Sequence, residues 1–213
     1  MTINFVENNI GTARTFSIVN VWKKPIAIFP DFINDQDYCR NFFDLGNNIS
    51  GSGNDGFTII DQSVLNRQLS IANNRFSLIS ESKEDLLKYY EKFLSKIDED
   101  TDYKNLTNVS AYGINIQIEL PLKTDVNSFL SAAVLKPNLQ MKVSNLEYVI
   151  NLQDGDYLNI VINAMPGSST TLLAMINHHH SKETSLLSID ELISEIDVAI
   201  EKIKNFVINP LLN

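Results

Sequence analysis

Residues 112 to 120, YGINIQIEL, constrain the fold most, because apolar and polar residues alternate strictly along them. Side chains on successive residues of a β-strand point to opposite faces, so this pattern predicts a strand with one face on a core and the other in water. The core-facing set is Ile114, Ile116, Ile118 and Leu120, and the water-facing set is Asn115, Gln117 and Glu119.

Residues 139 to 177 have the pattern of an antiparallel meander. Asp154-Gly155 lies between two alternating runs, which is the strongest short-range indication of a β-hairpin. A second turn is expected at 166 to 169, Pro-Gly-Ser-Ser. The expected strands are LQMKV (139 to 143), EYVINLQ (147 to 153), YLNIVINAM (157 to 165) and TTLLAMIN (170 to 177).

The first part of the chain also predicts strands. Ala72-Asn73-Asn74 supplies a turn between the last two of them, because asparagine tolerates positive φ. The expected strands are TFSIVNVW (15 to 22), PIAIF (25 to 29), FTII (57 to 60), LNRQLSI (65 to 71) and RFSLIS (75 to 80).

Apolar residues at helical spacing predict four helices. The clearest spans 83 to 97, with Ser82 as its N-cap and Asp85 in the capping-box position. A helix over 189 to 208 begins with the capping box of Ser188 and Glu191 and ends before Pro210. Shorter helices are expected at 35 to 45 and 125 to 135.

Strands and helices in this order predict an α+β fold, with mostly antiparallel sheet and helices packed on one face. A chain of 213 residues suits a single domain over 1 to 213, and a linker near 98 to 108 could divide it into an N-terminal and a C-terminal half. No sequence repeat occurs at a fixed period. Residues 46 to 56, GNNISGSGNDG, are expected to form a mobile surface loop.

The net charge of −9 disfavours nucleic acid and anionic membrane surfaces as partners. Few guanidinium groups are available for phosphate; the arginines are Arg14, Arg40, Arg67 and Arg75. The single Cys39 indicates a reducing compartment, and the opening residues lack the pattern of a signal peptide. We therefore expect a cytoplasmic protein, and its asparagine-rich composition suits an AT-rich bacterial or phage genome.

The sequence gives little support for a catalytic or cofactor-binding motif. Gly51 to Gly56 fits G-x-G-x-x-G, but a strand follows it where a dinucleotide site needs a helix. No nucleophile elbow occurs, and Cys39 lies on the apolar side of an expected helix, which indicates a buried thiol. The acids at 98 to 102 lie in linker sequence, where solvated carboxylates are the norm.

The run His178-His179-His180 contains every histidine of the chain. If the preceding strand continues, His178 and His180 share a face and could both bind a metal, with Asp154 or Asp156 as a third ligand. The favoured interpretation is a polar, solvated strand end, because no established zinc motif is present. We assign no metal ligand, no cofactor-binding residue and no catalytic residue.

Trp22 and Tyr112 are aromatic residues that could stack on a ligand. An exposed tryptophan would mark an interface, although core packing is the favoured interpretation.

We expect a non-enzymatic protein-binding module, and a homo-oligomer is possible because open sheet edges can pair. The alternatives are an enzyme or metal-binding protein with its site near His178 and His180, and a holdase-like chaperone.

Overall fold

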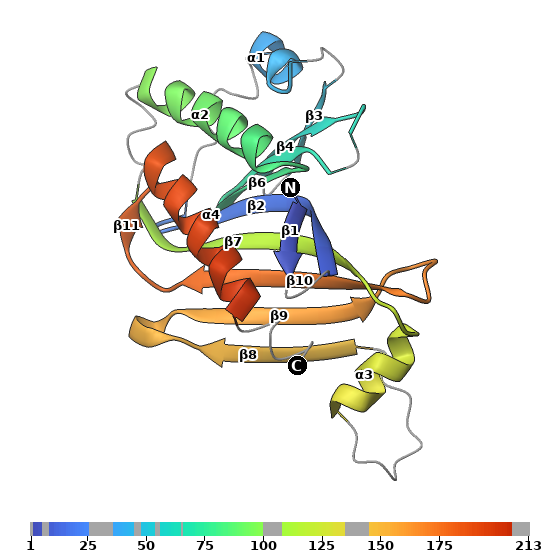
Figure 1. Cartoon of the computed structure of the whole chain (residues 1–213). Helices are drawn as coiled ribbons and strands as arrows, with labels where there is room; N and C mark the ends of the chain where they lie inside the picture. Colours follow the sequence, from blue (N-terminus) through green and yellow to red (C-terminus); the bar gives the residue numbers. More distant parts are fainter. Residues whose placement is uncertain are drawn as a thin grey trace.

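The computed structural model describes residues 2–5, 9–25, 36–44, 48–53, 56–64, 66–99, 108–134 and 145–205. Its α+β fold confirms the predicted class (Figure 1). The strands are β1 Thr2–Phe5, β2 Asn9–Trp22, β3 Asn48–Gly53, β4 Gly56–Asp61, β5 Gln68–Ala72, β6 Arg75–Ser80, β7 Asn108–Pro121, β8 Asn145–Asn151, β9 Tyr157–Ala164, β10 Thr171–His180 and β11 Thr184–Ser185. The helices are α1 Gln36–Asn41, α2 Lys83–Glu99, α3 Val126–Val134 and α4 Ile189–Ile203.

Every pairing among the described strands is antiparallel, and the strands form one sheet. The order across it is β3-β4-β5-β6-β2-β7-β10-β9-β8, with β1 beside β2 and β11 beside β7. The two longest strands, β2 and β7, pair at the centre of the sheet. The sheet therefore runs without a break from the N-terminal to the C-terminal half of the chain.

The strand order is mirrored about the central β2–β7 pair. On one side the order is β2-β6-β5-β4, and on the other it is β7-β10-β9-β8. In each half, the first strand is followed by a connection that carries a short helix, then by a meander, then by a long helix (Figure 1). The meander is β8-β9-β10 in the C-terminal half, whereas in the N-terminal half the edge strand β3 precedes β4-β5-β6. Apart from β3, the two halves thus repeat one topology, although their sequences show no repeat at a fixed period.

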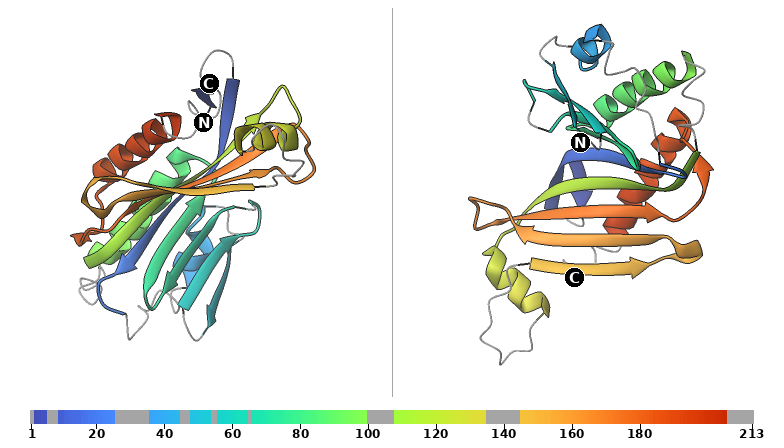
Figure 2. Two further views of the ribbon diagram at one scale, coloured as in Figure 1. Left: turned by 90° about the horizontal axis from the view of Figure 1, so that it is seen from below. Right: turned by 180° about the vertical axis from the view of Figure 1, so that it is seen from behind.

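Helices α2 and α4 pack on one face of the sheet, and this layer holds the core (Figure 2). Strand positions facing the helices are buried, for example Phe16 and Ile18 on β2 and Ile114 on β7. The two helices also contact each other, since the Tyr90 hydroxyl donates a hydrogen bond to the Leu187 carbonyl that precedes α4.

The opposite face, which we call the open face, carries none of the described helices across its central strands (Figure 2, right). It consists of the alternate strand positions, which are half-buried or exposed in most cases. On the central strands these are Thr15, Ser17, Val19, Val21, Asn115, Gln117, Glu119, Leu173, Met175, Asn177 and His179. The alternation predicted for 112 to 120 is confirmed, with Asn115, Gln117 and Glu119 on this face.

The four predicted helices are confirmed, and their described ends agree to within about one turn, while 206 to 208 of the last prediction lie outside the described residues. Ser188 and Glu191 form the expected capping box of α4, and the Asp85 backbone N–H donates to the Ser82 hydroxyl at 3.0 Å. The Asp154-Gly155 hairpin is also confirmed, and both residues have positive φ. The predicted strand LQMKV, Pro210 and most of PIAIF lie outside the described residues.

The prediction of a mobile loop over 46 to 56 is wrong, because Asn48–Gly53 form strand β3. Its backbone pairs with β4 from Asn48–Asp61 to Gly53–Gly56. This segment carries a single apolar side chain, Ile49, so its composition contains no strand pattern. The neighbouring strand supplies the backbone partners that hold it extended.

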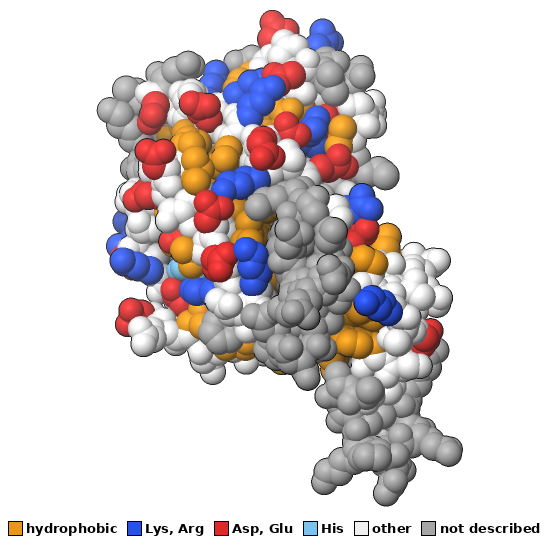
Figure 3. Space-filling view, in the orientation of Figure 1, with side chains coloured by type: hydrophobic (Ala, Val, Ile, Leu, Met, Phe, Trp, Pro, Cys, Tyr) orange, Lys and Arg blue, Asp and Glu red, His pale blue; other side chains and the backbone are white. Residues whose placement is uncertain are grey.

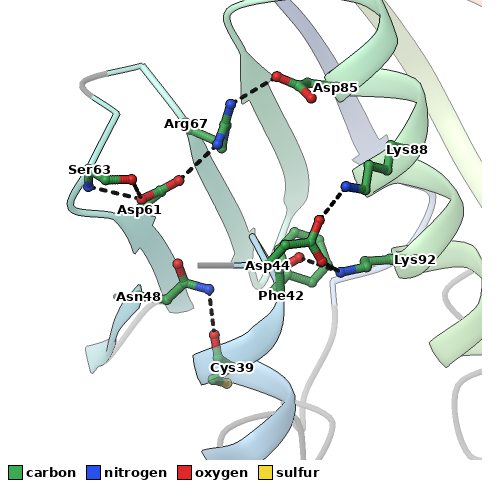
Figure 4. A network of polar contacts seen from close by, with 10 residues as sticks. All are labelled: Cys39, Phe42, Asp44, Asn48, Asp61, Ser63, Arg67, Asp85, Lys88 and Lys92. Atoms are coloured by element: carbon green, nitrogen blue, oxygen red, sulfur yellow. Dashed lines mark hydrogen bonds and ion pairs between the residues drawn. The ribbon is translucent and has the colours of Figure 1, made fainter. Parts of the chain in front are cut away.

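A buried ion pair links the β4–β5 connection to α2 (Figure 4). The Asp61 side chain is 0% exposed, and its carboxylate accepts hydrogen bonds from Ser63 and from Arg67, the latter at 3.0 Å. Arg67 also contacts Asp85 at 2.8 Å. Burial raises the pKa of Asp61, but the bonds from Ser63 and Arg67 outweigh it and hold the pKa below its usual value.

Replacing Arg67 with methionine should therefore destabilise the fold. The change leaves the Asp61 carboxylate buried without its cation, which costs about 3 kcal/mol in free energy of unfolding. Lys88→Met is the matched control, because Lys88 pairs with Asp44 at an exposed position (Figure 4). Urea denaturation should show a large loss for Arg67→Met and little for Lys88→Met; equal losses would contradict this assignment.

Candidate functional site

The histidines continue strand β10, and alternation sends them to opposite faces. His178 and His180 lie on the helix side, 0% and 9% exposed, whereas His179 lies on the open face against Tyr157. The prediction that His178 and His180 share a face is confirmed. The favoured interpretation of a solvated strand end is wrong, because α4 covers this end of the sheet and buries both rings.

His180 contacts Asp156 in the β8–β9 connection and Tyr112 on β7. Its Nδ1 lies 2.8 Å from Asp156 Oδ2, and its ring stacks on Tyr112 with centroids 4.4 Å apart. Asp156 is oriented in turn by the backbone N–H of Ser181. Of the two predicted third ligands, Asp156 therefore lies at the histidines and Asp154 is exposed in the turn.

His178 lies between His180 and helix α4. Its Nδ1 is 3.2 Å from His180 Nε2, and its Nε2 is 2.8 Å from Lys202 Nζ. An ammonium group can only donate, so His178 Nε2 accepts from Lys202 and the ring proton lies on Nδ1. His178 then donates to His180 Nε2, and His180 donates from Nδ1 to Asp156. One consistent set of ring protons thus satisfies both histidines.

Glu195 of α4 does not fit this hydrogen-bonded chain. Its Oε2 lies 3.1 Å from His180 Nε2, a nitrogen that already accepts from His178. The contact lacks hydrogen-bond geometry, and no described group donates to this buried oxygen. The nearby His180 and a hydrogen bond from the Tyr112 hydroxyl to the Glu195 carboxylate lower the pKa of this carboxyl, although burial raises it. An ionised oxygen and a ring nitrogen therefore face each other. We call Tyr112, Asp156, His178, His180, Glu195 and Lys202 the histidine cluster.

The cluster is buried but reaches the molecular surface. Burial, followed by the neighbouring His180 and Lys202, lowers the pKa of His178 to about 4. A small area of histidine (pale blue) is visible among acidic and basic side chains on the face that carries α2 and α4 (Figure 3). Small ions could reach the cluster from this side.

The other predicted candidates have structural roles. Trp22 is 4% exposed, and its Nε1 donates to the Ala72 carbonyl, so core packing is confirmed and an exposed tryptophan is excluded. Cys39 is buried as predicted. The G-x-G-x-x-G segment lies in the β3–β4 hairpin, and Asp100 and Asp102 of the acidic run lie outside the described residues. Tyr112 is 7% exposed and belongs to the histidine cluster.

A hollow of about 540 Å³ lies between α1 and α2. Tyr38 and Phe42 form its apolar wall, and the polar and charged side chains that line the rest are Asn41, Lys88, Glu91, Lys92, Ser95 and Lys96. Lys88 and Lys92 pair with Asp44, while Lys96 lies over the Tyr38 ring. Its cations thus already have partners within the protein.

Sequence reasoning missed Glu195 and Lys202. They lie seven residues apart, or two turns, and therefore on one side of α4 beside its buried stripe. A charged residue flanking an apolar stripe is common on any amphipathic helix. Only the packing of α4 across β7 and β10 brings these two residues to the histidines.

Comparison with known protein families and with curated proteins finds no match to this chain. No helix among the described residues is long and apolar enough to cross a membrane.

The lowered pKa of His178 predicts acid sensitivity. The unfolded chain binds a proton near the ordinary histidine pKa of 6.5, whereas the native site resists it down to about 4. Lowering the pH through this window should reduce the free energy of unfolding by up to about 3 kcal/mol. The groups facing His178 are His180 on its own strand, Glu195 and Lys202 on α4, and Asp156 from the β8–β9 turn.

Urea denaturation in the presence of a chelator, at pH values between about 7 and 4.5, measures this effect. His178→Gln removes the titrating ring, so its free energy of unfolding should depend less on pH than that of the unmodified chain. Parallel pH profiles for the two proteins would show that His178 does not contribute.

Proposed function

We propose that this chain is a non-enzymatic protein-binding module and that the open face of its sheet contacts the partner. One observation carries the proposal. Among the described residues, the large apolar side chains that remain exposed concentrate on this face. They are Val21, Ile49, Ile60, Val149 and Met175, whereas Val198 on α4 is the exposed one on the helix side.

The charge of the open face supports a protein partner. In a chain of net charge −9, the charged residues on its described strands are Arg75, Glu147 and the Arg14–Glu119 ion pair. Amide and hydroxyl side chains fill the positions between them, including the hydrogen-bonded pairs Thr15–Gln117 and Thr58–Ser70. Protein interfaces have this character, with few charges at their centre and apolar groups among hydrogen-bonding ones.

Two alternatives fit the open face less well. A holdase-like chaperone needs a large contiguous apolar surface, and here asparagine, glutamine and serine separate the apolar side chains. An enzyme or metal-binding protein would use the histidine cluster on the other side of the sheet. The unpaired oxygen of Glu195 favours metal binding.

A charge placed on the open face should abolish partner binding. Met175 is 39% exposed at its centre, and Val198 is 40% exposed on α4, so Met175→Glu and Val198→Glu are matched in exposure and chemistry. Each glutamate would remain solvated in the free protein, but Met175→Glu would be desolvated in the complex. Cross-linking and affinity capture from a native lysate should recover a partner with the unmodified chain and Val198→Glu, and not with Met175→Glu.

Light scattering on the same three proteins identifies self-association. If the partner is a second copy, the oligomer should be lost in Met175→Glu alone. Capture of the same proteins by all three chains, with no difference in mass, would contradict a binding role for the open face.

A further inference from the structure

We propose that the histidine cluster is a binding site for a divalent transition-metal ion of the zinc class, with His178 Nδ1, His180 Nε2 and Glu195 Oε2 as ligands. This inference is independent of the proposed partner binding, because the cluster lies on the helix side of the sheet. It concerns atoms from β10 and α4, and His178 Nδ1 and Glu195 Oε2 both lie next to His180 Nε2.

The two distances from His180 Nε2 to the other ligand atoms suit a tetrahedral ion. Zinc binds ligand atoms at about 2.0–2.1 Å, so two ligand atoms of a tetrahedral site lie ~3.3 Å apart. His178 Nδ1 is 3.2 Å from His180 Nε2, and Glu195 Oε2 is 3.1 Å from the same nitrogen. Small side-chain movements would therefore complete the site, with a fourth position left for water or another ligand.

The surroundings of His180 are those of a metal-binding histidine. Such a histidine donates its other ring N–H to a carboxylate, which fixes the ring and raises its basicity. Asp156 supplies this carboxylate at 2.8 Å from Nδ1, and stacking on Tyr112 holds the plane of the ring. Asp156 thus acts through His180 and is a positioning residue.

A cation also removes the conflict at Glu195. The oxygen is buried, lacks a donor among the described residues and lies against a ring nitrogen that has no proton to donate to it. A metal between oxygen and nitrogen turns this contact into two coordination bonds. Histidine nitrogens with a carboxylate oxygen suit zinc and its neighbours better than calcium or magnesium, which prefer oxygen alone.

Lys202 opposes the metal. It donates to His178 Nε2, and this keeps the ring proton on Nδ1, the atom that must bind the ion. Binding requires the proton to move to Nε2 or to leave, and Lys202 to swing aside. Glutamine at 202 would offer an oxygen acceptor for an Nε2 proton and should strengthen the site.

Isothermal titration with Zn²⁺, on the full chain without an affinity tag, tests the proposal. His180→Ala should lose about 100-fold or more in affinity, and Glu195→Gln and Asp156→Asn about 10- to 100-fold each. Lys202→Gln should bind more tightly than the unmodified chain. His179→Ala is the matched control, because this neighbour faces the opposite side of the sheet and should bind normally.

Co²⁺ provides a readout of geometry, since a tetrahedral site gives intense visible absorption that Glu195→Gln should weaken. Circular dichroism checks that each variant is folded. If His180→Ala unfolds, the near-isosteric Glu195→Gln still tests whether the cluster binds zinc. Equal zinc affinity in the unmodified chain, His180→Ala and Glu195→Gln would overturn the site. So would an equal loss in His179→Ala, which indicates adventitious binding by a histidine run.

Discussion

The antiparallel pairing of β2 with β7 is the interaction on which the rest of the structure depends. It runs from Thr12–Glu119 to Trp22–Val109 and joins strands from the two halves of the chain. Without this pairing, the sheet of the N-terminal half would end at β2 and the sheet of the C-terminal half would end at β7. Pairing joins β3-β4-β5-β6-β2 to β7-β10-β9-β8 in one broad sheet. It also brings α2 and α4 together on the same face, where Tyr90 bonds to the Leu187 carbonyl just before α4.

The fold could be predicted from sequence wherever a local pattern was strong. Period-two alternation identified β7, and Asp154-Gly155 identified the β8–β9 hairpin. The N-cap Ser82 identified the start of α2, and the capping box of Ser188 and Glu191 identified the start of α4. Strand β3 was missed because its Gly, Ser and Asn residues carry no pattern, and a neighbour holds it in place. The mirrored strand order could not be predicted either, because it depends on which strands pair, and the sequence pattern does not specify the pairing.

The candidate site was predictable in part. Alternation placed His178 and His180 on one face, and turn position brought Asp156 within range. Their burial was not foreseen, because it depends on where α4 crosses the sheet. Glu195 and Lys202 reach the histidines only through that crossing, and a helix with one apolar stripe does not reveal which strand end it will cover.

Consecutive histidines on β10 face opposite sides of the sheet, and this links two chemically different surfaces through one backbone. His178 and His180 lie under α4, while His179 stacks on Tyr157 beside the open face. A strand is stiff along its length and cannot shift one side chain far without its neighbours. A displacement of β10 at the histidine cluster would consequently also move His179 on the open face. The strand can therefore couple the two faces of the sheet.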